Sequence, residues 1–275
     1  MYIPQEQLNN FKKTLSAGKA VVIYGPRRCG KTTLIKKFLE NCKKPYLFVN
    51  GEDIDVQQYL SSQSIIKLKN FVGENKLLVI DEAQKIPNIG LNLKLIVDNI
   101  KEIKIIATGS SAFDLVSTLG EPLTGRKNTL KIFPLAQLEI SQVENQIETK
   151  GNIENKLIFG SYPEVVITQD NNKRRQYLKE IASSYLYKDI LELEGLRRSD
   201  KLTRLLQLLA FQIGKEVSFQ ELGTQLSISK NTVDRYLDLL EKTFVIFRIS
   251  GFSRNLRKEI SKWQVPHILD TDSQI

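Results

Sequence analysis

The sequence predicts an α/β fold with a mainly parallel sheet, followed by a helical region and a small helix-turn-helix module. In the first half of the chain, short apolar runs rich in β-branched residues alternate with helical patterns, which is typical of strands joined by crossover helices. Helical patterns without proline dominate much of the second half. Near its end, three helical patterns precede a β-rich run. Together these features indicate an α/β domain and an attached helical part.

The predicted strands of the first domain occupy residues 20–24, 45–50, 76–80, 103–108 and 129–133. The predicted helices occupy residues 32–41, 56–71, 91–100 and 112–119. Crossover helices between successive strands imply a parallel sheet that is covered on both faces. A polar stretch at residues 144–155 indicates a boundary or an exposed connection, so we expect the first domain to span residues 1–145.

The second part is expected to hold a helical lid or linker at residues 146–198 and a further domain at residues 199–275. Its predicted helices include residues 173–193 and 200–213, with Gly214 as a C-cap. Ser218 and Glu221 have the spacing of a capping box that opens the next helix. An apolar stripe follows at helical spacing, and residues 244–249 then read as a strand; the stripe consists of Val233, Tyr236, Leu237 and Leu240. Three helices followed by a hairpin-like segment are typical of a winged helix-turn-helix.

Composition excludes several classes of protein. Hydrophobic residues make up 41% of the 275 residues and charged residues 26%, which is ordinary for a globular chain and argues against wholesale disorder. Two cysteines cannot form a disulfide framework, and no apolar run is long enough to cross a bilayer. No signal segment opens the chain, so we expect a cytoplasmic protein without a membrane partner. The net charge of +9 favours polyanionic partners, without deciding among them.

A phosphate-binding loop is the strongest motif. Residues 25–32 read Gly-Pro-Arg-Arg-Cys-Gly-Lys-Thr and fit the pattern G-x-x-x-x-G-K-[S/T], also called Walker A. Its glycines let backbone amides curl around phosphate oxygens, Lys31 supplies a positive charge, and the Thr32 hydroxyl can bind Mg²⁺. A predicted strand precedes the loop and a predicted helix follows it. We assign nucleotide binding to Gly25, Pro26, Arg27, Arg28, Cys29, Gly30, Lys31, Thr32 and Thr33.

A second motif, Walker B, ends the predicted strand at residues 76–80. The next two residues, Asp81 and Glu82, are carboxylates. Asp81 is expected to hold Mg²⁺ together with Thr32, and Glu82 is expected to orient or deprotonate the attacking water. The adjacent acid suits hydrolysis, and the chain has no N-K-x-D guanine reader, so ATP is favoured over GTP.

Two further residues are candidates for contact with the terminal phosphate. Ser110 follows the predicted strand at residues 103–108, although ordinary turn chemistry explains this Gly-Ser-Ser segment equally well. Arg126 could stabilise charge in the transition state, within its own subunit or from a neighbouring one. The alternative for Arg126 is a solvated surface arginine.

The motifs occur in an order that resembles the archaeal and bacterial AAA-type ATPases with an appended C-terminal domain of unknown function. The segments that carry the resemblance are residues 25–34, 80–86, 108–111, 123–126, 133–135 and 160–164. The resemblance implies a P-loop ATPase of the additional-strand type, with Ser110 as its sensor. In similar proteins a nuclease-like fold follows the winged helix, whereas residues 268–272 here depart from that pattern. A nuclease function is therefore not carried over.

Duplex DNA is one candidate partner of the predicted winged helix. Lys230, Asn231, Thr232 and Arg235 would begin its recognition helix. A basic tail follows, formed by Arg248, Arg254, Arg257, Lys258 and Lys262. Three acids on the same helix oppose a phosphate backbone, namely Asp234, Asp238 and Glu241. The alternative is a module that packs on the ATPase, on a protein partner or on a second copy.

The sequence therefore predicts a Mg²⁺-dependent ATPase whose nucleotide state moves a C-terminal winged-helix module. Two alternatives stay open: a DNA-binding regulator that uses ATP as a slow switch, and an interaction protein without catalysis.

Overall fold

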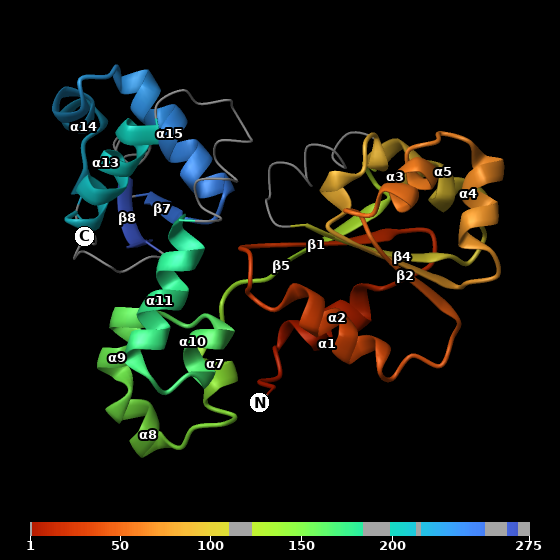
Figure 1. Cartoon of the computed structure of the whole chain (residues 1–275), viewed down its shortest axis with the longest axis horizontal. Helices are drawn as coiled ribbons and strands as arrows, with labels where there is room; N and C mark the ends of the chain where they lie inside the picture. Colours follow the sequence, from red (N-terminus) through yellow and green to blue (C-terminus); the bar gives the residue numbers. More distant parts are fainter. Residues whose placement is uncertain (1, 110–122, 184–198, 213–215, 251–262, 269–275) are drawn as a thin grey trace. The chain divides into compact units, whose positions relative to one another are not determined.

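The computed structural model describes residues 2–109, 123–183, 199–212, 216–250 and 263–268. The chain divides into two compact units, Met1–Asn145 and Gln146–Ile275 (Figure 1). Each unit has its own hydrophobic core. The expected division of the second part at residue 198 remains a prediction.

The first unit is built on a five-stranded sheet in which every described pairing is parallel. Its strands are β1 (Ala20–Tyr24), β2 (Tyr46–Asn50), β3 (Leu77–Asp81), β4 (Lys104–Gly109) and β5 (Lys127–Lys131). Their order in the sheet is β2-β3-β4-β1-β5, so β4 lies between the strand of the phosphate loop and the strand of the carboxylates. This is the additional-strand arrangement that the resemblance implied.

Burial explains why these segments form strands. All five residues of β1 are buried, and the first four residues of β3 are buried too. Such continuous apolar runs suit the centre of a parallel sheet, because helices cover both of its faces. The edge strands β2 and β5 are partly exposed.

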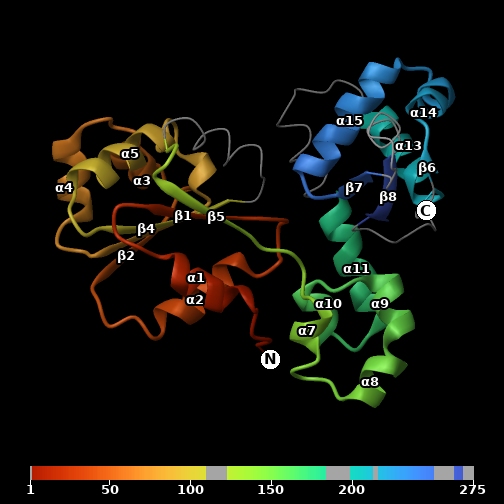
Figure 2. The same ribbon diagram turned by 180° about the vertical axis from the view of Figure 1, so that it is seen from behind.

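Helices cover both faces of the sheet. Helices α1 (Gln7–Thr14) and α2 (Lys31–Leu39) lie on one face (Figure 1). The opposite face carries α3 (Ile54–Leu60), α4 (Ile65–Val72) and α5 (Ile89–Asn99) (Figure 2). Buried side chains of α1 and α2 join those of the sheet in one core, in which the Phe11 and Phe38 rings meet edge to face at 4.9 Å.

One sequence prediction in this unit is wrong. The single helix expected at residues 56–71 is two helices, α3 and α4. Gln63, between them, has a positive φ of 50°, a conformation that a continuing helix does not allow. Asp53 caps α3 by accepting a hydrogen bond from the amide of Asp55 at 2.9 Å. The helix expected at residues 112–119 lies outside the described residues.

The second unit begins with four short helices. They are α8 (Gln146–Gly151), α9 (Ile153–Phe159), α10 (Pro163–Ile167) and α11 (Asn171–Ile181). A small cluster of buried residues holds α9 to α11 together, formed by Phe159, Tyr162, Val165 and Leu178. The polar segment expected to be a boundary or connection is thus largely helical, although no residue of α8 is buried. Before it, α7 (Gln137–Ile140) is the last helix of the first unit.

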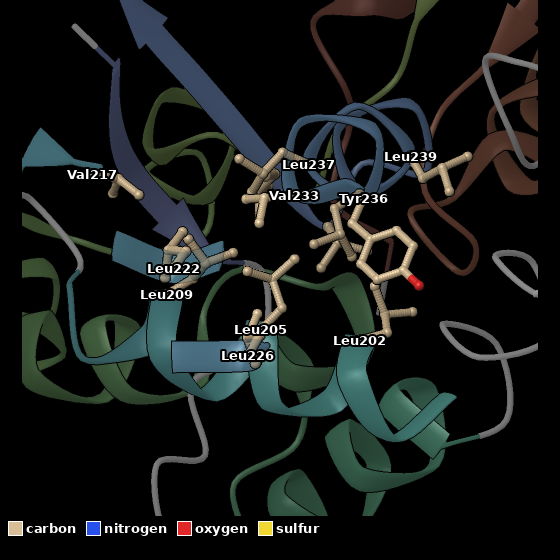
Figure 3. Packing of buried hydrophobic residues seen from close by; sticks show 13 residues of the cluster. Leu202, Leu205, Leu209, Val217, Leu222, Leu226, Val233, Tyr236, Leu237 and Leu239 are labelled. Atoms are coloured by element: carbon tan, nitrogen blue, oxygen red, sulfur yellow. The ribbon is translucent and has the colours of Figure 1, made fainter. Parts of the chain in front are cut away.

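The rest of the second unit combines helices with a small antiparallel sheet. In chain order it contains α13 (Ser199–Ala210), β6 (Glu216–Val217), α14 (Phe219–Leu226), α15 (Lys230–Lys242), β7 (Ile246–Ser250) and β8 (Trp263–Ile268). The sheet order is β6-β8-β7, and both pairings are antiparallel. Side chains from α13, α14 and α15 meet in one core (Figure 3). All four residues of the predicted apolar stripe are buried in it.

Capping explains where α14 and α15 begin. The Ser218 hydroxyl accepts from the amide of Glu221 at 3.3 Å, and the Ser229 hydroxyl accepts from the amide of Thr232 at 3.1 Å. Gly214, the predicted C-cap, lies outside the described residues. Residues 184–193 of the helix predicted at 173–193 lie outside them as well. None of the helices in the described ranges is long and apolar enough to span a membrane.

Candidate nucleotide-binding site

The predicted site lies at one edge of the parallel sheet. The phosphate loop follows β1, Asp81 ends β3, and Thr108 lies near the end of β4. Because parallel strands point the same way, their carboxyl ends meet at the same edge, which is where ligands bind in such sheets. The loop and the two carboxylates, distant in sequence, therefore share one edge.

Two glycines shape the phosphate loop. A side chain on Gly25 would place its Cβ 1.9 Å from the carbonyl oxygen of Ile132, so only glycine fits against that backbone. Gly30 is the N-cap of α2 and has a left-handed conformation with φ of 96°. Cys29 between them is fully buried, and its Sγ lies 3.6 Å from the carbonyl oxygen of Ile132. Burial raises the pKa of the Cys29 thiol, although the Lys31 charge opposes this, so the residue fills space as a neutral thiol.

Lys31 is a buried cation at the mouth of the loop. Its side chain is 7% exposed, and its Nζ donates to the carbonyl oxygens of Gly25 at 3.0 Å and Pro26 at 2.6 Å. These carbonyls hold the ammonium over the loop in a direction fixed by the backbone. A positive charge in this position complements phosphate oxygens.

Thr32 and Asp81 connect the two motifs directly. The Thr32 Oγ1 donates to Asp81 Oδ2 at 2.9 Å. A hydroxyl and a carboxylate are hard oxygen ligands, which suit Mg²⁺. Mg²⁺ keeps several waters and commonly takes only one or two protein ligands beside the phosphates, so this pair fits the ion. Within the described ranges, no group of three or more His, Cys, Asp or Glu is placed to hold a metal.

Thr108 joins both carboxylate residues and was not among the residues assigned from the sequence. It is buried within β4, donates its hydroxyl hydrogen to Asp81 Oδ1 and accepts from the amide of Glu82 at 3.2 Å. Its signal in the sequence was a hydroxyl residue at the end of an otherwise apolar strand. The neighbouring Ser110, which was chosen instead, lies outside the described residues.

Glu82 has an unusual backbone. Its φ of 50° and ψ of 43° are left-handed, which is uncommon for a residue with a side chain. Gln84 Nε2 donates to Glu82 Oε2 at 2.5 Å. On the other side, a Cβ on Gly51 would lie 2.4 Å from the carbonyl oxygen of Glu82, so β2 approaches closely at this turn. Strained backbone of this kind is concentrated at functional sites.

Arg126 lies away from this edge. It directly precedes β5, whose first residue pairs with Ala20 at the start of β1, while Tyr24 at the end of β1 pairs with Lys131. At about 3.3 Å per residue, the length of β1 separates Arg126 from the loop by more than about 13 Å. The Arg126 Nε donates to Asp98 Oδ1 at 2.6 Å. The structure does not bring Arg126 to the phosphate loop of its own chain; a role towards a neighbouring copy stays a prediction.

Comparison with known proteins places these motifs in a family context. Residues 17–141 match the AAA domain family. Residues 150–271 match the domain of unknown function DUF8612. The chain is thus similar to an AAA domain in its first part and to a domain of unknown function in its second part, the arrangement that the motifs resembled.

Three relatives are longer proteins whose names describe them as uncharacterized. One from Methanocaldococcus jannaschii is 25% identical over 87% of this chain and 58% of its own length. One from Mycobacterium tuberculosis is 24% identical over 94% of this chain and 56% of its own. One from Haemophilus influenzae is 27% identical over 90% of this chain and 65% of its own. The chain therefore spans less than two thirds of the length of each.

Among solved structures, one match is a signal transduction ATPase with numerous domains that carries a tetratricopeptide repeat sensor, from Pyrococcus horikoshii. Its identity is 16%, its TM-score is 0.38, and the match covers 96% of this chain and 41% of the other.

Proposed function

We propose that this chain, an AAA domain followed by a domain of unknown function, binds ATP with Mg²⁺ and hydrolyses it. The observation that carries the proposal is the hydrogen bond between Thr32 and Asp81, with the buried Lys31 beside it. It joins the residue after the loop lysine to the first carboxylate of the second motif. A glycine turn that bound no phosphate would not need a buried ammonium, a hydroxyl and a carboxylate at one edge.

Each residue has a distinct role in this proposal. Backbone amides of residues 27–33 cradle the phosphates, and Lys31 neutralises their charge. Thr32 and Asp81 would hold Mg²⁺, which would offset the negative charge that develops on the phosphates. Glu82 accepts a proton from the attacking water or orients it. Gln84 fixes one oxygen of the Glu82 carboxylate, which leaves the other for the water.

The experiment is steady-state hydrolysis of ATP with Mg²⁺ by the wild type and by Glu82→Gln. The amide cannot accept the proton, so turnover is expected to fall by about 10²- to 10⁴-fold while ATP binding persists. Glu52→Gln is the control, since Glu52 is an exposed glutamate in the same unit. Equal turnover of Glu82→Gln and wild type would contradict the catalytic assignment. Absence of turnover in the wild type, with ATP still bound, would favour a slow nucleotide switch.

We further propose that residues 199–268 form a winged helix-turn-helix that the nucleotide state moves. The order of α13, β6, α14, α15, β7 and β8, with an antiparallel sheet after the helices, supports this proposal. Gly223 supports it too, because a Cβ there would lie 2.9 Å from the carbonyl oxygen of Ile228 in the turn before α15. Because glycine has no Cβ, α14 can approach the turn before α15 closely.

Duplex DNA is a candidate partner of this winged helix, and one observation favours it. Lys230, Asn231 and Arg235 are exposed near the start of α15, where a recognition helix contacts DNA. Asp238 on the same helix is paired with Lys242 at 2.6 Å, which reduces its opposition to phosphates. Of the basic tail, Arg254, Arg257, Lys258 and Lys262 lie outside the described residues.

The DNA proposal is tested by binding of a labelled duplex at several salt concentrations, with wild type and a Lys230→Ala/Arg235→Ala double variant. Loss of two phosphate contacts should weaken binding and lower the salt slope by about 2. Lys173→Ala/Arg175→Ala on α11 is the matched control for charge. Binding that is unchanged in the α15 variant would contradict a DNA contact there and favour a protein partner or a second copy.

A further inference from the structure

Few polar side chains are buried within the described residues, and one of them, Gln5, lies outside the catalytic motifs but beside the phosphate loop. The buried polar set comprises Gln5, Lys31, Asn92, Thr108 and Glu139. Lys31 and Thr108 belong to the site described above. Gln5 precedes α1, and its side chain reaches the loop from outside. Burying an amide is costly unless it is hydrogen-bonded, so its partners indicate what it does.

Gln5 holds one peptide group of the loop. Its Nε2 donates to the carbonyl oxygen of Cys29 at 2.9 Å, in a buried contact. A Cβ on Gly30 would lie 3.4 Å from the same nitrogen, so the amide of Gln5 packs directly over the Gly30 Cα. Gln5 therefore covers the peptide that joins Cys29 to Gly30.

Peptide geometry links this contact to phosphate binding. In a trans peptide the C=O and the following N–H lie in one plane and point in opposite directions. A Cys29 carbonyl held towards Gln5 thus turns the Gly30 N–H away from Gln5 and into the loop. Glycine adopts either sign of φ at little cost, so this peptide could otherwise rotate. Gly30 has no side chain to restrain this peptide, so the hydrogen bond from Gln5 supplies the restraint.

The segment around Gln5 is itself anchored on both sides. Ile3 is buried, with 6% of its surface exposed. The amide of Glu6 donates to Glu139 Oε1 at 2.8 Å. The other oxygen of Glu139 accepts from the amide of Ala136 at 2.8 Å, which fixes the carboxylate at the start of α7. Gln5 is thus flanked by a buried residue and a hydrogen-bonded one, which restrain its position beside the loop.

The geometry points to Gln5 as a positioning residue of the phosphate loop: it orients the Cys29–Gly30 peptide so that the Gly30 N–H faces a bound phosphate. This inference rests on the proposed nucleotide function and deepens it, because it assigns the recognition of phosphate partly to a residue outside the loop.

The test compares Gln5→Leu with wild type in calorimetric titrations of Mg²⁺-ATP and of inorganic tripolyphosphate. Leucine fills similar space without a donor, so both affinities are expected to fall about tenfold, the size of one hydrogen bond to a charged ligand. The control is Asn92→Leu, which removes another buried amide. Asn92 lies on α5, where it accepts from the amide of Gln63 at 2.8 Å and donates to the carbonyl of Asn88 at 2.9 Å. The Asn92→Leu variant is expected to have a lower melting temperature, but its affinities for Mg²⁺-ATP and tripolyphosphate should stay within about twofold of the wild-type values.

A second variant, Gln5→Glu, tests the donor itself. At low pH the introduced carboxyl is protonated and can donate to the Cys29 carbonyl, so its affinity relative to wild type should exceed that of Gln5→Leu. At high pH the carboxylate repels that carbonyl, and the relative affinity should fall below that of Gln5→Leu. If Gln5→Leu does not fold, the affinities of Gln5→Glu at low and at high pH, each relative to wild type, can be compared with one another instead.

The outcomes separate the two proposals. Wild-type affinities in Gln5→Leu, or an equal loss in Asn92→Leu, would overturn the role of Gln5 and leave the nucleotide site intact. A wild-type protein that binds neither ATP nor tripolyphosphate would overturn the proposed function, and the role of Gln5 with it.

Discussion

Thr32 and Asp81, 49 positions apart in the chain, are joined by a hydrogen bond of 2.9 Å between a hydroxyl and a carboxylate oxygen. The bond connects the first turn of α2 to the end of β3. Both side chains are therefore held at the spacing that a shared cation requires, before any ligand arrives.

Lys31→Ala is expected to weaken ATP binding by about 10- to 100-fold, since charged hydrogen bonds to phosphate are lost. Calorimetry or fluorescence titration measures the change. Lys36→Ala is the matched control, because Lys36 lies on the same helix with its side chain exposed. Normal ATP binding by Lys31→Ala would defeat the assignment of the loop.

Thr108→Val is expected to reduce turnover more than ATP affinity. Valine preserves the shape but removes the hydroxyl that holds Asp81 Oδ1 and the Glu82 amide. Two partly buried polar groups then lose a partner, which should also lower the free energy of unfolding by about 1–3 kcal/mol. Hydrolysis rates and urea denaturation measure the two effects. Thr129→Val, at an exposed position of β5, should change neither, and an equal effect there would contradict the role of Thr108.

Gly25→Ala is expected to lower the free energy of unfolding by about 2 kcal/mol or more, because its Cβ would overlap the carbonyl of Ile132. The loop must shift to relieve the overlap, so ATP affinity falls as well. Gly151→Ala has open space around the new methyl group and lies in α8, where alanine should stabilise by about 0.5–1 kcal/mol. Urea denaturation should give a lower free energy of unfolding for Gly25→Ala and a higher one for Gly151→Ala than for wild type. Gly25→Ala with wild-type stability would show that β5 does not approach the loop this closely.

Alkylation is expected to modify Cys42 well before Cys29. Burial raises the pKa of the Cys29 thiol, so its reactive thiolate forms only at a pH above the ordinary range, while Cys42 is partly exposed. Mass spectrometry of peptides after timed iodoacetamide treatment at several pH values measures both rates. In urea the two cysteines should react alike. A Cys29 that reacts as fast as Cys42 in the folded protein would indicate an open loop.

The phosphate loop and the strand before Asp81 were predictable because each depends on a local pattern. A run of buried apolar residues forms a central strand wherever helices cover both of its faces, and the loop motif fixes its own turn. Helix boundaries were less predictable. The break between α3 and α4 depends on the backbone at Gln63, whose left-handed conformation no apolar pattern reveals.

Other features depended on contacts between distant segments. Ser110 was chosen from the end of its predicted strand and lies outside the described residues, whereas Thr108 in β4 contacts the Asp81 carboxylate and the Glu82 amide. That contact depends on the pairing of β4 with β3, which the pattern of either strand alone does not specify. Gln5 carried no motif, and its contact with Cys29 depends on how residues 2–6 fold back over the loop.

The sequence by itself determined the α/β class, the phosphate loop and the two carboxylates that follow β3, because apolar runs and short motifs encode local structure. Only the tertiary structure decided which residues share the site. Sheet order placed β4 between β1 and β3, which brought Thr108 to Asp81, and strand direction put Arg126 at the opposite edge from the loop. Strand order and direction arise from packing between segments far apart in the chain, and no local pattern contains that information.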